Sequence, residues 1–271
     1  KAQPFLAVVS YPDPHGPNTV RAPYDRMFNH LRFLAPRTYG RDDLPTPGWL
    51  GGGKNHAVFR GEQMSLYFGM VKCIDDNVGR LLRALEEDNE LESTIVMMTS
   101  DHGDLCYEHD RLNKGNPYEG SARVPMLIRY PKRLRGGRVY SRPVGTVDVT
   151  PTLLGLAGLP QASEMQGRNL SDRLDSGAGQ GSQGDDIVFL RNAGTRPNWV
   201  AAIDDRYKLG LSVNDRPWLF DHESDPDELL NFFDRPGTAG ATKRLADALK
   251  AYASKSEDPF FLDAKISSSL E

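Results

Sequence analysis

The sequence places a carboxylate and an imidazole side by side in Asp101-His102-Gly103, directly after the apolar run Thr94–Thr99. A carboxylate oxygen and an imidazole nitrogen commonly bind divalent metals, and they also work together as an acid–base pair. Gly103 would let the backbone turn sharply after them. Alternatively, Asp101 caps a turn and His102 packs against its surroundings. The tripeptide alone leaves these interpretations open.

Three further side chains are candidates for the same chemistry. Lys114, in Asn-Lys-Gly, follows Asp101 by thirteen residues, and a lysine near a metal can neutralise an anionic substrate or its leaving oxygen. His15 lies in a proline-bound loop after Phe5–Val9, which could direct its imidazole into the same crevice. His109 is a weaker candidate of this kind. The ordinary interpretations are an exposed lysine and two structural histidines.

The paired carboxylates Asp75 and Asp76 are not expected to bind metal. They lie in the middle of a predicted helix, with the cations Lys72 and Arg80 within one turn. Opposite charges at that spacing form ion pairs on an exposed helix face.

Apolar runs and periodic patterns predict the elements that position these residues. Phe5–Val9 is a continuous apolar run, which predicts a strand buried on both faces, and Thr94–Thr99 predicts the next buried strand. Between them, apolar residues from Met64 onward recur on one face of a helix that ends near Glu87. A helix followed by a strand with polar residues just beyond it predicts an α/β fold that binds ligands outside the carboxyl ends of its strands.

Further along, Val124–Tyr130 and Gly145–Val149 predict two more strands. Thr150 is the expected N-cap and Pro151 the first residue of a helix that Gly158 ends. Two irregular stretches are expected, a surface excursion at 18–61 and a linker rich in Gly, Ser, Asp and Gln at 171–186. Short strands then predict a small antiparallel sheet. They are Ile187–Arg191, Trp199–Asp204, Tyr207–Val213 and Trp218–Phe220, followed by a helix over Ala239–Ser254.

Composition excludes several classes of protein. The 271 residues are 38% hydrophobic and 26% charged, with a net charge of −4, and the aliphatic runs exclude disorder throughout. No apolar stretch approaches the roughly 18 residues of a membrane span. No Lys/Arg-rich run is present, so nucleic acid is not an expected partner. The cysteines, Cys73 and Cys106, form neither a disulfide framework nor a Cys-x-x-Cys zinc motif.

Taken in order, the motifs resemble those of a known family. They are Ser10–Pro17, Cys73–Leu82, Thr94–Asp104, Glu108-His109, Asn113–Gly115, Arg123–Pro125, Val147–Leu154, Asp205–Leu209 and Leu219–Pro226. This series resembles the C-terminal two-thirds of a type I sulfatase, a formylglycine-dependent arylsulfatase of the alkaline-phosphatase-like superfamily. The resemblance covers nearly the whole chain. It implies an α/β sandwich with a mostly parallel central sheet, plus a small C-terminal antiparallel sheet packed on a helix.

The resemblance also implies domains and site roles. Residues 1–170 would be the C-terminal part of the catalytic domain, 187–262 a small α+β subdomain after the 171–186 linker, and 263–271 a tail. Asp101 and His102 would bind Ca²⁺ or another divalent cation, and Lys114 and His15 would contact the sulfate or its leaving oxygen. The expected activity is sulfuric ester hydrolysis. The expected substrate is a sulfated small molecule or carbohydrate, and the expected location is secreted, periplasmic or lysosomal.

Two parts of the family's active site are not found in this sequence. The formylglycine nucleophile is made from the first residue of a Cys/Ser-x-Pro-x-Arg motif, which neither Cys73 nor Cys106 begins. The family's N-terminal Asp-Asp metal pair is absent too. We expect both in an N-terminal part, as a missing segment or a companion chain, and we expect this chain alone to be inactive. The alternatives are a phosphodiester or phosphonate monoester hydrolase of the same superfamily, and a non-catalytic anion- or sugar-binding protein on a degenerate scaffold.

Overall fold

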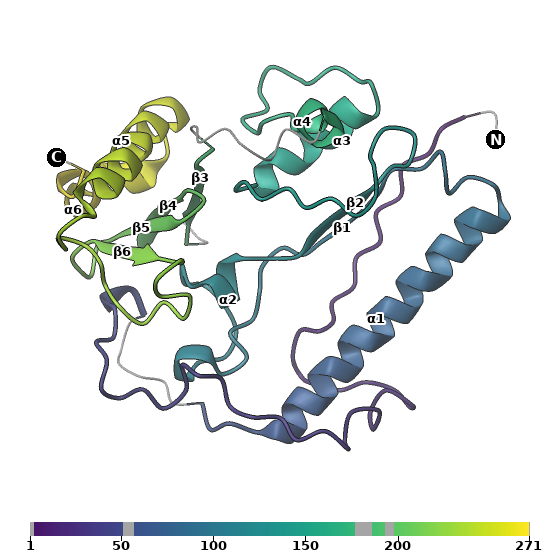
Figure 1. Ribbon diagram of the computed structural model, residues 1–271, viewed down its shortest axis with the longest axis horizontal. Coiled ribbons are helices and arrows are strands. Elements are labelled where there is room, and N and C mark those ends of the chain that lie inside the picture. Colours follow the sequence, from purple (N-terminus) through teal and green to yellow (C-terminus); the bar gives the residue numbers. More distant parts are fainter. Residues whose placement is uncertain (1–2, 51–56, 177–185, 193–197, 271) are drawn as a thin grey trace. The chain divides into compact units, whose positions relative to one another are not determined.

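The computed structural model describes residues 3–50, 57–176, 186–192 and 198–270 (Figure 1). Its internal contacts divide the chain into two compact units, residues 1–36 with 58–92 and residues 37–57 with 93–271. The first unit contains the long helix α1 (Gly61–Glu87), and the second contains the six described strands.

Helix α1 forms where the apolar period predicted it, beginning three residues before Met64. The helix approaches the backbone of Tyr24 closely at Gly69, because a Cβ at this position would lie 2.4 Å from the Tyr24 carbonyl oxygen. One turn further along, Lys72 Nζ lies 2.9 Å from Asp75 and 2.5 Å from Asp76. The expectation that this acidic pair forms ion pairs on the helix surface is therefore confirmed.

The prediction for Phe5–Val9 is wrong for the described structure. The segment is extended but pairs with none of the described strands, and the side chains of Leu6 and Val8 are 89% and 86% exposed. An apolar run is buried on both faces only where other elements cover it. The described residues of its unit supply no such cover.

The second unit contains a two-stranded antiparallel sheet that frames the candidate site. Strand β1 (Val96–Thr99) pairs with β2 (Met126–Arg129), with Thr99 opposite Met126. Between them the chain forms a 3₁₀ turn at Glu108–Asp110 and the short helix α2 (Glu119–Ala122). The resemblance implied a mostly parallel sheet. Among the described strands every pair is antiparallel, including β1 with β2.

The predicted strand Gly145–Val149 is instead a 3₁₀ turn at Thr146–Asp148. The buried side chain of Asp148 closes this turn by accepting a hydrogen bond from the Gly145 N–H at 3.0 Å. Helix α3 (Val149–Leu156) follows at once, so Thr150 lies inside the helix rather than at its N-cap. Gly158 ends it with a φ of 71°.

The predicted linker at 171–186 is partly helical, because α4 occupies Ser171–Ser176. Residues 177–185 lie outside the described residues. The small antiparallel sheet is confirmed, in the order β3-β4-β5-β6. Its strands are β3 (Val188–Arg191), β4 (Trp199–Ile203), β5 (Tyr207–Ser212) and β6 (Trp218–Asp221).

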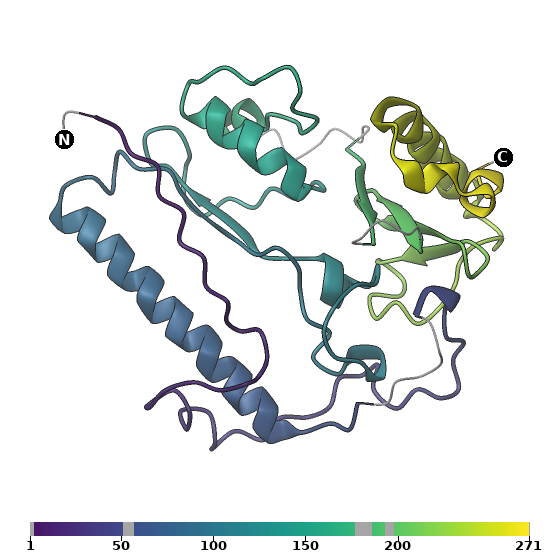
Figure 2. The same ribbon diagram turned by 180° about the vertical axis from the view of Figure 1, so that it is seen from behind.

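Both faces of this sheet are covered. Figures 1 and 2 show α5 (Ala239–Ser256) across one face, where Leu245 and Leu249 are fully buried. After the turn Pro259–Leu262, α6 (Ala264–Ser268) packs Ile266 into the same core. The last described residues thus belong to this packed layer, although a tail was expected there. The other face packs the following residues into a second core: Trp199, Ala201, Trp218 and Phe220 with Trp49 of the turn Gly48–Leu50, Leu105 and Tyr118.

Candidate active site

Asp101 and His102 lie just beyond the end of β1, with their side chains side by side. Asp101 Oδ1 accepts hydrogen bonds from the His102 N–H at 3.0 Å and from Ser100 Oγ at 3.2 Å. His102 Nδ1 lies 2.8 Å from the carbonyl oxygen of Gly103, and its Nε2 lies 3.4 Å from Asp101 Oδ2. A carbonyl only accepts, so Nδ1 carries a proton, and Nε2 is the ring atom that faces the Asp101 carboxylate.

The charge of Asp101 is set by the same contacts. Burial alone would raise the pKa of Asp101. The hydrogen bond from the His102 backbone and the positive field of the imidazole outweigh this effect, so the pKa lies below its usual range. The side chain is an ionised carboxylate at neutral pH, 83% exposed and available to a ligand.

Lys114 lies in an irregular loop that Ser121 fastens to the Asp101-His102 turn. The Gly103 N–H donates to the Ser121 carbonyl oxygen at 2.8 Å, and the Gly115 N–H donates to Ser121 Oγ at 3.1 Å. Gly103 leaves room for the backbone of Gly120, since a Cβ at position 103 would lie 2.2 Å from the Gly120 carbonyl oxygen. The sequence did not indicate this close approach. The Asp101-His102 and Lys114 segments are therefore joined through one serine.

Asp104 holds the base of the same loop. Its Oδ1 accepts from the N–H groups of Cys106 at 2.9 Å and Asn113 at 3.0 Å. Leu105 N–H donates to the Asn113 carbonyl oxygen at 2.9 Å, closing the turn that precedes Lys114. The motif included Asp104, but residue types alone did not indicate this role.

His109 is packed inside the loop, and His15 belongs to the other unit. The His109 ring stacks on Tyr118 with ring centroids 3.7 Å apart. Burial lowers the pKa of His109 to about 4, so it is a neutral, structural histidine in the packed part of the loop. His15 lies in the first unit, on an exposed turn where Nδ1 is 2.8 Å from the carbonyl oxygen of Gly16.

A second cluster of ionisable groups lies under the Lys114 loop. Glu119, His222 and Glu228 bring one ligand atom each to within 4.8 Å of one another, as a metal site would. The ammonium group of Lys208 already occupies this cluster, 2.7 Å from both carboxylates. Burial would raise the pKa of Glu228, but Lys208 and His222 hold it well below its usual range. The cluster is therefore a buried ion pair network rather than a vacant cation site.

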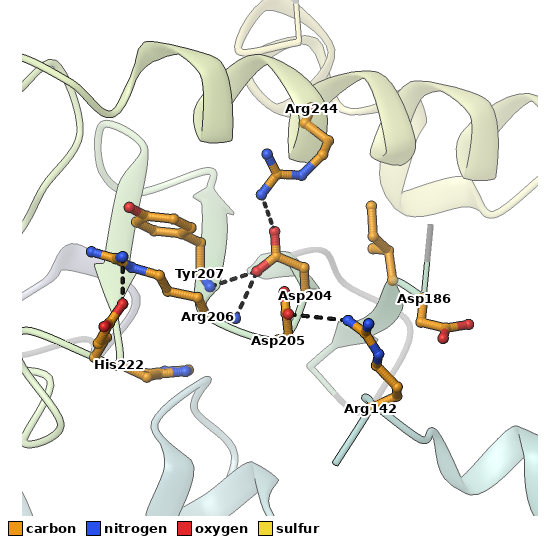
Figure 3. A pocket seen from close by; sticks show the side chains of 10 residues that line it. Arg142, Asp186, Asp204, Asp205, Arg206, Tyr207, His222 and Arg244 are labelled. Atoms are coloured by element: carbon orange, nitrogen blue, oxygen red, sulfur yellow. Dashed lines mark hydrogen bonds and ion pairs between the residues drawn. The ribbon is translucent and has the colours of Figure 1, made fainter. Parts of the chain in front are cut away.

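A cavity of about 810 Å³ opens beside this network (Figure 3). Figure 3 shows Arg244 reaching from α5 to Asp204, while Arg142 bonds Asp205 at 3.1 Å. Arg206 pairs with Asp221 at 2.7 Å. Each of these arginines has a carboxylate partner, so the positive charges on the cavity wall are balanced by neighbouring negative charges.

Comparison with known proteins identifies the chain. The family model for sulfatases matches residues 1–159. This chain belongs to the sulfatase family. A second model, described as the C-terminal part of N-sulphoglucosamine sulphohydrolase, matches residues 107–255. The resemblance seen in the motifs is thus confirmed.

Two curated relatives show how much of a sulfatase is present. An uncharacterized sulfatase, YidJ, of Escherichia coli (strain K12) is 30% identical over 95% of this chain and 52% of its own length. An arylsulfatase of Clostridium perfringens is 30% identical over 85% of this chain and 49% of its own length. The sulfatase chain therefore spans about half the length of these relatives.

Solved structures confirm the alkaline-phosphatase-like fold class. A putative sulfatase yidJ from Bacteroides fragilis has a TM-score of 0.73 at 25% identity, covering 89% of this chain and 51% of that one. BT4656, solved in complex with its substrate D-glucosamine-2-N,6-O-disulfate, has a TM-score of 0.63 at 27% identity and covers 76% of this chain and 42% of that one. A phosphonate monoester hydrolase from Silicibacter pomeroyi shares the fold, with a TM-score of 0.72 at 23% identity over 92% of this chain and 55% of that one. Among the described helices of the sulfatase chain, none has the length and apolarity that crossing a bilayer requires.

Proposed function

We propose that this chain supplies the C-terminal part of the active site of a sulfuric ester hydrolase. The observation that carries the proposal is the joining of the Asp101-His102 turn and the Lys114 loop through Ser121, in a member of the sulfatase family. A carboxylate, an imidazole and an ammonium group on one loop system suit a tetrahedral anion held against a cation.

We assign Asp101 and His102 as ligands of a divalent metal, with Ca²⁺ as the expected ion. The separation of 3.4 Å between Asp101 Oδ2 and His102 Nε2 fits two neighbouring ligands on one ion, which lie about 3.3–3.7 Å apart at Ca²⁺ bond lengths. The hydrogen bond from Nδ1 to the Gly103 carbonyl leaves Nε2 as the ligand atom. When bound, the ion would polarise the sulfate oxygens. Asp101 and His102 would hold the ion in place.

Lys114 and His15 are the groups proposed to act on the ester itself. The Lys114 ammonium would neutralise negative charge on the sulfate oxygens as the ester bond breaks. His15 would hold or donate a proton at the leaving oxygen. Sequence motifs alone support the role of His15. For Lys114 the support also includes its loop's attachment to the Asp101 turn.

We propose that the formylglycine and the Asp-Asp metal pair lie in the part of the relatives that this chain does not span, as an upstream segment or a companion chain. Reading the coding sequence upstream of Lys1 tests this. A Cys/Ser-x-Pro-x-Arg segment there supports a catalytic sulfatase. Its absence, also from any co-purifying chain, would favour the non-catalytic anion- or sugar-binding alternative.

The substrate is proposed to be a sulfated carbohydrate. Two findings support this class: BT4656 is bound to a sulfated glucosamine, and an N-acetylglucosamine-6-O-sulfatase of Bacteroides thetaiotaomicron is 31% identical over 70% of this chain. The alternative of a phosphonate monoester hydrolase has its own support in a structural relative from Agrobacterium radiobacter at 26% identity and a TM-score of 0.61. A secreted or periplasmic location is supported by a relative named as an extracellular sulfatase in Drosophila melanogaster.

A further inference from the structure

Lys208 is the most completely buried charged side chain among the described residues, with no exposed surface. It projects from the face of β5 opposite to Leu209 and Leu211, which pack under α5. Its ammonium donates three hydrogen bonds of 2.7 Å each, to the Pro117 carbonyl oxygen, Glu119 Oε1 and Glu228 Oε1. All three donors of the ammonium group are therefore used.

The partners of Lys208 belong largely to the segment that carries Lys114. Pro117 and Glu119 follow Lys114 directly in the chain, and the Glu119 N–H donates to Glu228 Oε2 at 2.6 Å. A neighbouring strand adds another bond, from Trp199 Nε1 to the Gly115 carbonyl oxygen at 3.1 Å. Two side chains of the C-terminal sheet, Trp199 and Lys208, thus bind the carbonyl oxygens of Gly115 and Pro117, and Glu228 beyond the last strand binds the Glu119 N–H.

This loop needs such attachment. Between Arg111 and Tyr118 it contains no helix or strand, and Asn113 and Gly115 both have positive φ, at 67° and 93°. Asn and Gly adopt positive φ more readily than other residues, so the sequence permits this conformation. The loop has no hydrogen-bond ladder of a helix or strand, so hydrogen bonds from other segments hold it in place. A displacement of about 1 Å in a group that contacts the reacting centre can cost about 100-fold in rate.

We infer that Lys208 and Trp199 are positioning residues, which fix the loop backbone and thereby the place where the Lys114 ammonium meets the anion. The inference rests on the proposed function of Lys114. Glu119 and Glu228 compensate the charge of the buried ammonium, and Glu119 belongs to the segment that follows Lys114. His222 adds a bond of 3.1 Å to Glu228 Oε1.

The test is a double-mutant cycle in the complete enzyme between Trp199→Phe and Lys114→Ala. Trp199→Phe keeps an aromatic ring in the core, removes the N–H that holds the Gly115 carbonyl, and leaves a small cavity that the control below also leaves. We expect it to lower kcat/KM for a sulfate ester about fivefold and to weaken inhibition by inorganic sulfate by a similar factor. In the Lys114→Ala background the same substitution should change kcat/KM by less than about twofold.

Trp218→Phe is the matched control. Trp218 is as buried as Trp199, in the same core, but its Nε1 donates to Asp215 at 3.0 Å and not to the loop. We expect a comparable fall in Tm and no coupling to Lys114→Ala. Lys208→Met should have a larger effect than Trp199→Phe with the same coupling. If Lys208→Met does not fold, the Trp199 cycle still decides the question.

The outcomes separate the two claims. Additive effects of Trp199→Phe and Lys114→Ala, or unchanged sulfate inhibition, would overturn the positioning role while the proposed function stands. Sulfate-ester hydrolysis that is insensitive to Lys114→Ala would overturn both, as would a complete enzyme that hydrolyses no sulfate ester.

Discussion

The Gly103 N–H and the Ser121 carbonyl oxygen, 2.8 Å apart, connect the segment leaving β1 with the segment entering β2. The same serine accepts from the Gly115 N–H through its side chain. One residue therefore sets the spacing between the proposed metal ligands and the proposed sulfate-binding lysine.

Substituting Gly103 should disturb this junction. In Gly103→Ala the new Cβ would lie 2.2 Å from the Gly120 carbonyl oxygen, so the backbone must shift. We expect a loss of about 1–3 kcal/mol in the free energy of unfolding, measured as a lower Tm of the complete enzyme. Gly240→Ala is the control, because it lies in α5 with no atom within 4 Å of the added Cβ. Because Gly240 lies in the first turn of α5, the added methyl group should change the free energy of unfolding by less than about 0.5 kcal/mol. Equal Tm values for the two variants would contradict the close approach at Gly103.

The carboxylate of Asp148 is expected to be one of the most important single groups for stability. It is buried and accepts from the Gly145 N–H and from three atoms of Arg168, the backbone N and Nη2 at 2.7 Å each and Nε at 3.4 Å. Asp148→Ala leaves the N–H groups of Gly145 and Arg168 without this acceptor, while the Arg168 guanidinium keeps Asp186, so the loss should be about 2–3 kcal/mol. Asp172, a 97% exposed partner of Arg133, is the control, and its alanine variant should cost less than about 1 kcal/mol. Denaturant titration measures both, and similar midpoints would contradict the difference in burial.

His109 should make stability depend on pH. Burial lowers its pKa from 6.5 to about 4, so the folded protein keeps the ring neutral where the unfolded chain binds a proton. Its contribution is complete above pH 6.5 and is lost as pH falls from about 6.5 toward 4. The total change is of order 3 kcal/mol at most. In His109→Phe, which keeps a ring beside Tyr118, this slope should be smaller. An unchanged slope of Tm against pH between 7 and 4.5 would refute the assignment.

Metal content should distinguish the Asp101-His102 pair from the group of Glu119, His222 and Glu228. If Asp101 and His102 bind the ion, Asp101→Ala should lose the bound metal and lower activity at least about 100-fold. His222→Gln, in the group that Lys208 already fills, should retain its metal. Elemental analysis of the complete enzyme measures both, with a chelated sample as the reference. Metal lost from His222→Gln and kept in Asp101→Ala would reverse the assignment.

The spacing of apolar residues along the sequence correctly predicted the strands and the helix of the C-terminal layer. The four C-terminal strands and α5 were predicted within two residues of their bounds, because buried alternation and the helical period both follow from packing. Gly145–Val149 was predicted wrongly because a side chain, Asp148, satisfies the backbone there and no apolar pattern indicates this. Phe5–Val9 was predicted wrongly because burial depends on what surrounds a segment.

The candidate site was predictable where residue types are adjacent. Asp101 and His102 are neighbours in sequence, and Lys114 is recognisable from the motif around it. The role of Lys208 was not predictable, since Glu119 lies 89 residues and Glu228 20 residues away along the chain. The one local signal for this role is that Lys208 stands directly before Leu209, Gly210 and Leu211, which are apolar or small residues of the same strand.

Specificity for the ester tests the central claim most directly. The complete protein should be assayed with aryl esters that differ only in the transferred group, namely sulfate, phosphate monoester and phosphonate monoester. If the metal and Lys114 are arranged for sulfate, kcat/KM for the sulfate ester should be at least about 100-fold higher than for the other two esters. In Lys114→Ala, kcat/KM for the sulfate ester should fall by about 100-fold or more. A preference for the phosphonate ester, or turnover of the sulfate ester unaffected by Lys114→Ala, would contradict the account.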